Sequence, residues 1–301
     1  MILVTGAGGF IGSQVCQLLS ARGESVLAVD RRFGESLDVR GAQKELGDLR
    51  STDFLSGLFQ KYSFDTVVHL AGLLNRASRQ YPEEAMHVNI GCSLHLLQLA
   101  IQFNVTKFIF GSSISVYGPK RYEKYGKVPE PEPASPNNVY GITKRYVEIV
   151  GEQYRQEDKI RFIALRISMA VGAGAEYTAS RWRSEIFENL QTNHHTQIQL
   201  PFASNEFLPL VHVADLAEMV KCLIEAKQTL HTIYNTPSEN WRCSDLADYI
   251  RSLNPNIELV FGPSTIRGDP EAIDGRRFIE EFGYRPIPLK QRLSQMIEES
   301  Q

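Results

Sequence analysis

The sequence predicts an α/β fold, in which a doubly wound parallel sheet is followed by a smaller, mixed α/β substrate lobe. Three observations support this prediction. Short apolar segments alternate with amphipathic segments through the first half of the chain, which is the pattern of strand–helix–strand units. The apolar segments are continuous, as expected for strands that are covered on both faces. Beyond about residue 170 the pattern is less regular.

Five apolar segments are expected to form the parallel strands, joined by right-handed crossovers. They are residues 1–6, 25–30, 66–72, 107–113 and 161–168. The segments 11–22, 51–61 and 84–103 have helical periodicity, and a further helix is expected to begin near Tyr140. We therefore place the first domain at residues 1–168.

Residues 169–301 are expected to form the second lobe, with an approximate boundary and with segments interleaved between the two domains. Helical stretches at 179–191, 213–226 and 244–252 alternate there with extended pieces such as IQLPF and LPLVHV. Repeated prolines exclude regular structure from the segment 119–138. A connection of that length is typical of a functional or disordered loop, and we expect this one to lie over the site.

Composition narrows the classes of function. The 301 residues carry a net charge of −3, which gives no basic surface for nucleic acid or anionic membranes. No apolar run reaches about 18 residues, so no transmembrane helix is predicted. The opening MILVTGAGGFIG lacks the basic start of a signal peptide, which indicates a cytoplasmic protein. The four cysteines have no metal-ligand spacing, so we expect reduced thiols and no metal.

A glycine-rich loop, TGAGGFIG, follows the first predicted strand directly and opens a helix. Gly6 would allow the tight turn, Gly9 the close approach of a pyrophosphate, and Gly12 the packing of helix on strand. The free N–H groups of the helix N-terminus favour bound phosphate. A glycine triplet also occurs in ordinary turns, but its position between strand and helix favours dinucleotide binding.

The second predicted strand ends in Asp30, where a carboxylate can accept bonds from the adenosine ribose and repel a 2′-phosphate. This favours NAD, although Arg31 and Arg32 could hold the phosphate of NADP. A surface acid or helix cap is the alternative for Asp30. Asp48 is predicted either to bind the adenine amine or to cap the helix that starts near Ser51.

The stretch VYGITK places Tyr140 and Lys144 four residues apart, on one helix face. A free tyrosine has a pKa of about 10, and a lysine charge within about 4–6 Å lowers it. Tyr140 could then accept a proton from an alcohol while Lys144 holds the nicotinamide ribose. The alternative is an ordinary solvated pair, since this spacing is common by chance.

Serines follow the fourth predicted strand, in FIFGSSISVYG. Ligands of open parallel sheets lie beyond the carboxyl ends of the strands. A hydroxyl there could bind the substrate oxygen and stabilise developing charge. Ser112, Ser113 and Ser115 are all candidates by position.

The chain resembles the extended short-chain dehydrogenase/reductase superfamily, and within it the NAD-dependent epimerase/dehydratase family. The matching pieces cover almost the whole chain in order: TGAGGFIG, Asp30, GDLRS, VVHLAG, the asparagine of HVNIGCSLHLL, FIFGSSISVYG, NNVYGITKRYVE, LVHVADLA and YNTPSENW. The resemblance implies a Rossmann domain that binds NAD(P), a C-terminal substrate lobe, and a catalytic triad of Ser113, Tyr140 and Lys144.

The resemblance also implies further contacts. Asn89 would lie on a central helix near the active site, and a homodimer would form through a four-helix bundle built from 88–103 and 140–155. The glycines, Asp30, Arg31, Asp48, Tyr140 and Lys144 are expected to line the cofactor. Further residues expected there are Phe10, Ile11, Leu49, Leu70, Ala71, Gly72 and Asn89.

Subfamilies differ at the residues after the catalytic serine. The related dehydratases carry Asp-Glu where this chain has Ile114 and Ser115, and the decarboxylases carry glutamate at the position of Ser115. Both reactions are therefore disfavoured. We expect either a sugar or sugar-nucleotide epimerase or a dehydrogenase of a smaller polar alcohol, such as a sugar acid or hydroxy amino acid. A non-catalytic NAD-binding sensor is the third alternative.

The substrate residues leave the nucleotide sugar open. Met169 stands where many related epimerases have a diphosphate-contacting asparagine, and Leu208 where they have an arginine. Charge-assisted hydrogen bonds to phosphate are strong, so a chain that lacks this arginine loses a strong contact to the diphosphate of a nucleotide sugar. Arg267 could bind phosphate or be a surface residue. Arg181 and Arg183 could hold a carboxylate or phosphate, or line a polar helix face. Ser113 and Ser115 complete the predicted substrate contacts.

Overall fold

The computed structural model describes residues 1–34, 41–174, 180–263 and 268–298. Within them, a parallel seven-stranded sheet has the order β10-β6-β5-β4-β1-β2-β3. Its strands are β1 (Ile2–Thr5), β2 (Val26–Asp30), β3 (Gln43–Leu46), β4 (Thr66–His69), β5 (Lys107–Ser113), β6 (Arg161–Ile167) and β10 (Ile233–Asn235). The five predicted strands and the doubly wound parallel sheet are confirmed.

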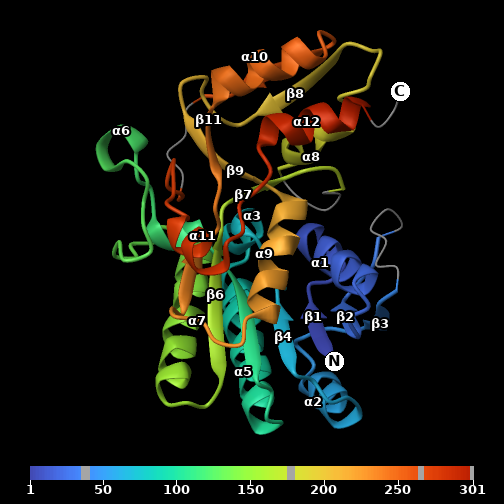
Figure 1. The fold of residues 1–301 in the computed structure, drawn as a ribbon. Helices are drawn as coiled ribbons and strands as arrows, with labels where there is room; N and C mark the ends of the chain where they lie inside the picture. The colour runs from blue at the N-terminus through green and yellow to red at the C-terminus, as the bar shows by residue number, and fades with distance from the viewer. Residues whose placement is uncertain (35–40, 175–179, 264–267, 299–301) are drawn as a thin grey trace.

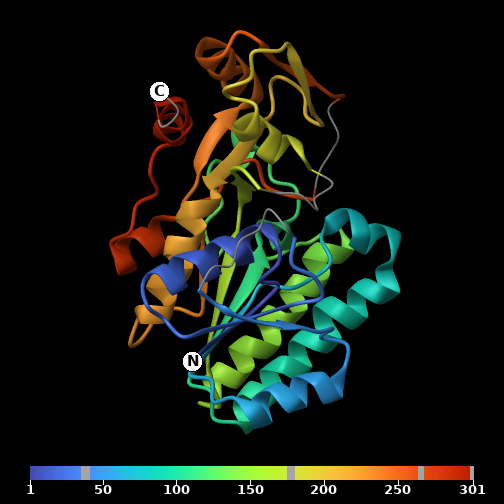
Figure 2. The same cartoon turned by 90° about the vertical axis from the view of Figure 1, so that its right-hand side faces the viewer.

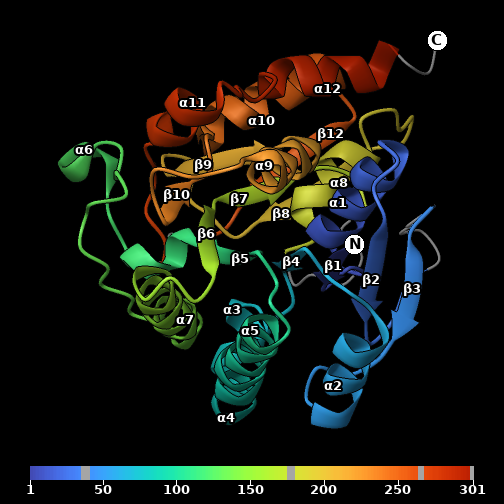
Figure 3. The same cartoon turned by 60° about the horizontal axis from the view of Figure 1, so that its bottom comes forward.

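Helices cover both faces of this sheet (Figure 3). One layer contains α1 (Phe10–Ala21), α9 (Val213–Glu225) and α11 (Arg276–Phe282), which share one apolar core with the sheet. The other layer contains α2 (Thr52–Lys61), α5 (Ser93–Gln102) and α7 (Val139–Gln156), which share a second core. Because α9 and β10 follow residue 169 in the chain, the later part of the sequence returns to complete the first domain.

The second lobe lies above the carboxyl ends of the central strands in Figures 1 and 2. It contains a three-stranded sheet, β11-β9-β7, and a two-stranded parallel sheet, β12-β8. The strands are β7 (Met169–Val171), β8 (Thr196–Leu200), β9 (Phe207–His212), β11 (Glu239–Arg242) and β12 (Ile257–Phe261), packed against α8 (Trp182–Glu188), α10 (Cys243–Leu253) and α12 (Leu289–Glu298). The mixed α/β character that the sequence predicts is confirmed.

Two predicted segments differ from the structure. The stretch 84–103 is not one regular helix: α3 (Asn75–Gln80), α4 (Pro82–Ala85) and a π-helix over Met86–Cys92 precede α5. π-Helical turns often occur at functional sites, and this one carries Asn89. The segment 119–138 contains the helical turn α6 (Tyr122–Tyr125), so the prediction that it lacks regular structure is wrong.

No helix in the described ranges is long and apolar enough to cross a membrane.

Candidate active site

The predicted functional residues meet at the carboxyl ends of three neighbouring strands, β1, β4 and β5. The glycine loop follows β1, Gly72 follows β4, and Ser113 is the last residue of β5. Helix α7 starts beside them because the side chain of Asn138 accepts a hydrogen bond from the Gly141 N–H (2.8 Å). This cap places Tyr140 and Lys144 in the first two turns of α7.

Close backbone contacts fix the glycine loop. Gly6 has φ +74°, and a Cβ there would lie 2.6 Å from the Ala71 nitrogen. A Cβ on Gly12 would lie 2.1 Å from the Gly6 carbonyl oxygen. Both positions therefore require glycine. This agrees with the tight turn predicted at Gly6 and with the close packing of helix on strand predicted at Gly12. Gly8, which the sequence analysis did not single out, has the same requirement because its Cβ would lie 2.1 Å from the Arg32 carbonyl oxygen.

The N-terminus of α1 fits a phosphate group. Gly9 caps the helix without a side-chain bond, and the first turn contains no acidic residue. The Ser13 N–H makes the bond to the Gly9 carbonyl (3.0 Å), so the N–H groups of Phe10, Ile11 and Gly12 precede the first helical hydrogen bond. A phosphate at this end would meet N–H donors and the positive end of the helix dipole.

Asp30 lies directly against this loop. Its Oδ2 accepts a bond from the Gly8 N–H (3.0 Å) and its Oδ1 accepts one from the Arg32 N–H (3.3 Å). The carboxylate is thus held at the carboxyl end of β2, beside the phosphate-binding turn. Arg31 is exposed and comes immediately after the strand. These positions suit recognition of an adenosine ribose by Asp30.

Asp48 does not cap the helix that follows it. The cap of α2 is Ser51, whose Oγ accepts from the Phe54 N–H (3.2 Å). Asp48 instead accepts bonds from the guanidinium of Arg50 (2.6 and 3.0 Å), which lowers the pKa of this carboxyl group. The capping alternative for Asp48 is therefore wrong, because the hydroxyl of Ser51 already satisfies the helix end.

The apolar residues predicted at the cofactor pack against the cores on the two faces of the seven-stranded sheet. Phe10, Ile11 and Leu70 pack, partly buried, against the core that contains α1. Leu49 packs in the same way against the core that contains α2. Their side chains are therefore anchored in the sheet domain and hold the neighbouring backbone in place.

Asn89 joins the end of β4 to α7. Its Oδ1 accepts from the Leu73 N–H (2.7 Å), and its Nδ2 donates to the Leu73 carbonyl (3.0 Å) and to Thr143 Oγ1 (3.2 Å). A Cβ on Gly72 would lie 3.0 Å from Asn89 Oδ1 and 3.6 Å from Lys144 Nζ. Asn89 and Lys144 therefore converge on the backbone at Gly72, which agrees with the expected place of Asn89 near the site.

Lys144 is buried beneath the end of β5. Its Nζ donates to the Gly111 carbonyl (2.7 Å) and lies 4.6 Å from the centre of the Phe110 ring. It lies 5.7 Å from the centre of the Tyr140 ring. Burial lowers the pKa of Lys144 to about 8, and the charge of Glu148 partly opposes this shift.

The phenol of Tyr140 has a pKa raised to about 12, chiefly by burial. A hydrogen bond with Ser113 lowers this pKa, the charge of Asp269 raises it, and the charge of Arg183 lowers it. The predicted lowering by Lys144 is therefore not found in this structure. The ammonium group of Lys144 donates to the Gly111 carbonyl, and for Tyr140 the loss of hydration on burial outweighs the favourable effects of Ser113 and Arg183.

Of the three candidate serines, Ser113 is the one whose hydroxyl lowers the pKa of the Tyr140 phenol. The hydroxyl of Ser112 points elsewhere and donates to Glu148 Oε1 (2.6 Å). Ser115 lies next to Ser113, with 3.2 Å between their hydroxyl oxygens, and donates to Asp269 Oδ1. The structure thus brings Ser113, Ser115 and Tyr140 together, and it adds Asp269.

Asp269 was not predicted from the sequence. It belongs to the IRGDP stretch, in which only Arg267 was singled out, and Arg267 lies outside the described residues. An acid beside an arginine in a connecting segment gives no signal of its own. Its functional position depends on a contact with Ser115, which is 154 residues away in the chain.

The two arginines of the second lobe have different surroundings. Arg181 pairs with Glu188 (2.9 Å) and Glu185 (3.7 Å), which places it on the polar face of α8. Arg183 is close enough to Tyr140 and Asp269 for their charges to raise its pKa against the effect of burial. Its Nε is buried with no hydrogen-bond partner in the described structure. Arg183 therefore lies near enough to Tyr140 and Asp269 to interact with their charges, whereas Arg181 forms ion pairs with two acids of α8.

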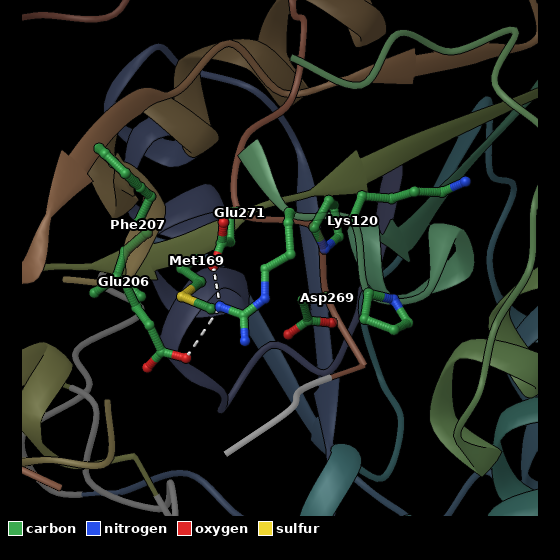
Figure 4. A pocket seen from close by; sticks show the side chains of 10 residues that line it. Lys120, Met169, Glu206, Phe207, Asp269 and Glu271 are labelled. Atoms are coloured by element: carbon green, nitrogen blue, oxygen red, sulfur yellow. Dashed lines mark hydrogen bonds and ion pairs between the residues drawn. The ribbon is translucent and has the colours of Figure 1, made fainter. Parts of the chain in front are cut away.

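A pocket of about 30 Å³ lies next to these residues (Figure 4). Figure 4 shows the carboxylates of Glu206 and Glu271, each joined by a dashed line to the guanidinium of Arg121 (3.6 and 2.7 Å). The full lining consists of Pro119, Lys120, Arg121, Met169, Glu206, Phe207, Leu208, Asp269, Pro270 and Glu271. As expected, part of the 119–138 segment lies at the site. In the described part of the chain, no group of three His, Cys, Asp or Glu residues could hold a metal ion.

The chain is similar to known proteins over most of its sequence. The sequence model of the NAD dependent epimerase/dehydratase family matches residues 2–236. The chain is 31% identical over 176 residues to a UDP-glucose 4-epimerase of Halalkalibacterium halodurans, which covers 57% of this chain and 51% of the relative. A UDP-glucose 4-epimerase of Lacticaseibacillus casei is 32% identical over 177 residues, with 57% and 52% covered. The matched region thus spans about half the length of these relatives.

Solved structures have the same fold at lower identity. A UDP-glucose 4-epimerase of Thermotoga maritima with UDP-glucose has a TM-score of 0.86 and 24% identity, covering 99% of this chain and 97% of the other. An L-threonine 3-dehydrogenase of Trypanosoma brucei has a TM-score of 0.85 and 21% identity, covering 99% and 96%. The family match spans most of the sequence, so the chain belongs to the NAD-dependent epimerase/dehydratase family.

Proposed function

We propose that this protein is an NAD-dependent hydride-transfer enzyme that epimerises a sugar or sugar nucleotide. The observation that supports the proposal is the convergence of Ser113, Tyr140 and Lys144 beside the glycine loop. These residues come from β5 and α7, and Lys144 Nζ lies 3.6 Å from where a Cβ on Gly72 would be, after β4. Because β4 pairs with β1, the strand that leads into the glycine loop, we infer that the phenol would act beside a dinucleotide bound at this loop.

The residues around the loop fit NAD. The N–H groups of Phe10, Ile11 and Gly12 would hold the pyrophosphate, Asp30 the adenosine ribose, and Lys144 the nicotinamide ribose. Bound NAD would supply an acceptor for the hydrogen on the substrate's carbinol carbon.

The chain's own groups would handle the proton. Ser113 would donate a hydrogen bond to the carbinol oxygen and stabilise its developing charge. Tyr140 would take the hydroxyl proton and, in an epimerase, return it to the same oxygen after the ketone has turned. Burial raises the pKa of Tyr140 to about 12, and the positive charge of a bound oxidised nicotinamide would lower it.

A dehydrogenase of a smaller polar alcohol is the second candidate, and the pocket favours it. Met169, Phe207 and Leu208 form an apolar wall, and Arg121 is already paired with two glutamates. Typical ligand pockets have about 300–1,000 Å³. The 30 Å³ present here would have to expand less for a small alcohol than for a nucleotide sugar.

Turnover of purified protein tests these proposals. The protein is incubated with NAD and a panel of UDP-sugars, sugar acids and hydroxy amino acids, while absorbance at about 340 nm and isomer composition are followed. Isomer conversion without net reduction supports the epimerase. Reduced cofactor formed in proportion to substrate supports the dehydrogenase. Cofactor binding without turnover of any compound would contradict both and leave an NAD-binding sensor.

We propose NAD rather than NADP because the Asp30 carboxylate, which accepts a bond from the Gly8 N–H, would repel a 2′-phosphate on an adenosine ribose bound beside this loop. Calorimetric titration of both cofactors tests this, and equal or tighter binding of NADP would contradict it. We also propose that residues 1–168 form the cofactor domain and 169–301 most of the substrate lobe, with 213–235 and 276–282 returned to the sheet domain.

A homodimer through a four-helix bundle is the proposed assembly. Ile142, Tyr146 and Ile149 lie along one face of α7 and are 52%, 48% and 50% exposed. Apolar side chains at i, i+4 and i+7 form the stripe that a partner helix covers. Light scattering should give a dimer mass that Ile149→Glu reduces to that of a monomer; a wild-type monomer would contradict the proposal. We propose a cytoplasmic location, which suits cysteines that form no disulfide with one another.

A further inference from the structure

A buried histidine joins two parts of the site that lie far apart in the sequence. His69 is the last residue of β4 and is buried. Its Nδ1 lies 2.6 Å from Thr5 Oγ1, at the end of β1, and its Nε2 lies 2.8 Å from Ser93 Oγ, at the start of α5. The ring therefore connects the residue before the glycine loop with the residue after the π-helix.

The hydroxyl of Ser93 supports the shape of the π-helix. The Ser93 N–H bonds the Ile90 carbonyl, and the Ser93 hydroxyl donates to the Asn89 carbonyl (2.7 Å). A hydroxyl that bonds the carbonyl four residues earlier often bends a helix, and π-helical turns are frequent at functional sites. This turn carries Asn89, whose side chain bonds Leu73 after β4. His69 thus holds the hydroxyl that supports the turn.

These contacts fix which nitrogen of His69 carries the proton. Because a carbonyl can only accept, the Ser93 hydroxyl uses its proton in the bond to Asn89 and must accept from the ring. Nε2 therefore carries the proton, and Nδ1 accepts from the Thr5 hydroxyl. Burial, and then the charge of Lys144, lowers the pKa of His69 to about 3, which agrees with a neutral ring.

From Asn89 the hydrogen bonds continue to the catalytic helix. Its Nδ2 donates to Thr143 Oγ1 (3.2 Å), and Thr143 Oγ1 donates to the Tyr140 carbonyl (2.8 Å). We propose that His69 is a positioning residue, which holds the π-helical turn against β1 so that Asn89 and α7 keep their place relative to a cofactor bound at the glycine loop. The inference rests on the proposed function, because it makes hydride transfer depend on that alignment.

The alignment affects the reaction more than it affects cofactor binding. A misplacement of about 1 Å in an active site can lower the rate by about 10²-fold. The N–H groups at the start of α1 and the carboxylate of Asp30 are held by contacts of their own. Loss of the hydrogen bonds of His69 should therefore lower kcat much more than NAD affinity or the substrate KM.

Three substitutions separate the roles of the two ring nitrogens. His69→Phe keeps an aromatic ring beside Phe108 and Phe110, whose centres lie 6.0 and 5.9 Å from that of His69, but it removes both hydrogen bonds. The amide of His69→Gln extends to about the place of Nε2 and can donate to Ser93. The shorter amide of His69→Asn extends to about the place of Nδ1, so it can serve Thr5 but not Ser93.

The NAD-bound protein at neutral pH gives two measurements that do not depend on activity. In ¹⁵N NMR of the imidazole nitrogens, we expect the proton of His69 on Nε2, with the signal identified by its loss in His69→Phe. Amide hydrogen exchange over residues 86–93 should be about tenfold faster in His69→Phe than in the wild type. Thermal melting shows that each variant is folded before it is compared.

Turnover of an active substrate tests the positioning role. It should fall by about 10–10²-fold in His69→Phe and His69→Asn, with NAD affinity and KM within a few-fold of the wild type, and His69→Gln should recover most of the loss. Tyr234→Phe is the matched control, because it removes a buried hydroxyl bond to Glu281 (2.7 Å) from another strand of the same sheet. It should leave turnover unchanged.

Several results would overturn the inference. A proton on Nδ1 would contradict the assigned bonds. Unchanged turnover in a folded His69→Phe protein would make the ring a structural residue, and equal losses of turnover and NAD affinity would limit its effect to the glycine loop. If His69→Phe does not fold, equal turnover in His69→Gln and His69→Asn overturns the inference. Failure of the proposed function is distinct: the wild type then turns over no substrate, and unchanged exchange over 86–93 still refutes the positioning role.

Discussion

Glu148 is expected to stabilise the base of the active site through a buried ion pair. It is fully buried and accepts bonds from Arg166 Nε and Nη2 (2.9 Å each), Ser112 Oγ (2.6 Å) and Arg145 Nη1 (3.0 Å). Arg166 is only 2% exposed. Glu148→Gln would therefore leave a buried guanidinium without its counter-charge, and breaking such a pair costs about 3–5 kcal/mol. Because glutamine keeps one acceptor, we expect about 3 kcal/mol.

Urea unfolding followed by circular dichroism measures this loss. Glu152→Gln is the matched control, because Glu152 also pairs with Arg145 (3.1 Å) on α7 but is 31% exposed. It should cost less than about 1 kcal/mol. The double variant Glu148→Gln/Arg166→Met removes both charges and should be less destabilised than the sum of the single variants by about 1–3 kcal/mol. A Glu148→Gln protein as stable as Glu152→Gln, with additive single effects, would refute the reasoning.

Three further predictions concern other buried contacts. Lys107 donates to the Leu223 and Ala226 carbonyls at the end of α9 (2.8 Å each), so Lys107→Met should lower the free energy of unfolding by about 1–3 kcal/mol; an unchanged urea midpoint would contradict this. Burial lowers the pKa of Lys144 from 10.5 to about 8. Between these pH values the unfolded chain binds a proton at this lysine that the folded protein does not. The free energy of unfolding of the wild type therefore rises with pH in this range. Lys144→Met should abolish turnover but raise the melting temperature at pH 7, with an advantage that shrinks toward pH 10; a lower melting temperature at pH 7 would count against it. Gly12→Ala should abolish NAD binding in calorimetry, because its Cβ would strike the Gly6 carbonyl, and normal affinity would show that the loop adapts.

The repeating core of the fold could be predicted because burial on both faces leaves continuous apolar runs in the sequence. The edge strands could not. Strand β3 has the polar sequence QKEL and is largely exposed, and β10 has only three residues. The π-helix over Met86–Cys92 also escaped prediction, because its apolar spacing resembles that of an ordinary helix.

Ser113, Tyr140 and Lys144 were predicted as a triad from local spacing and family resemblance, but the raised pKa of Tyr140 was not predicted. Spacing places Lys144 beneath the ring of Tyr140, whereas the Gly111 carbonyl decides where its ammonium group points. Asp269 escaped prediction for a similar reason. Its contact with Ser115 arises from pairing between segments that are about 150 residues apart, and a single sequence contains no signal for such pairing.

We propose that Tyr140 exchanges the substrate proton while the neighbouring residues hold the cofactor. The most direct test compares Tyr140→Phe with wild type for NAD affinity and for turnover of an active substrate. We expect NAD affinity to remain within a few-fold, because the phenol does not hold the dinucleotide, and turnover to fall by about 10²–10⁴-fold. Turnover at the wild-type level in Tyr140→Phe would contradict the account.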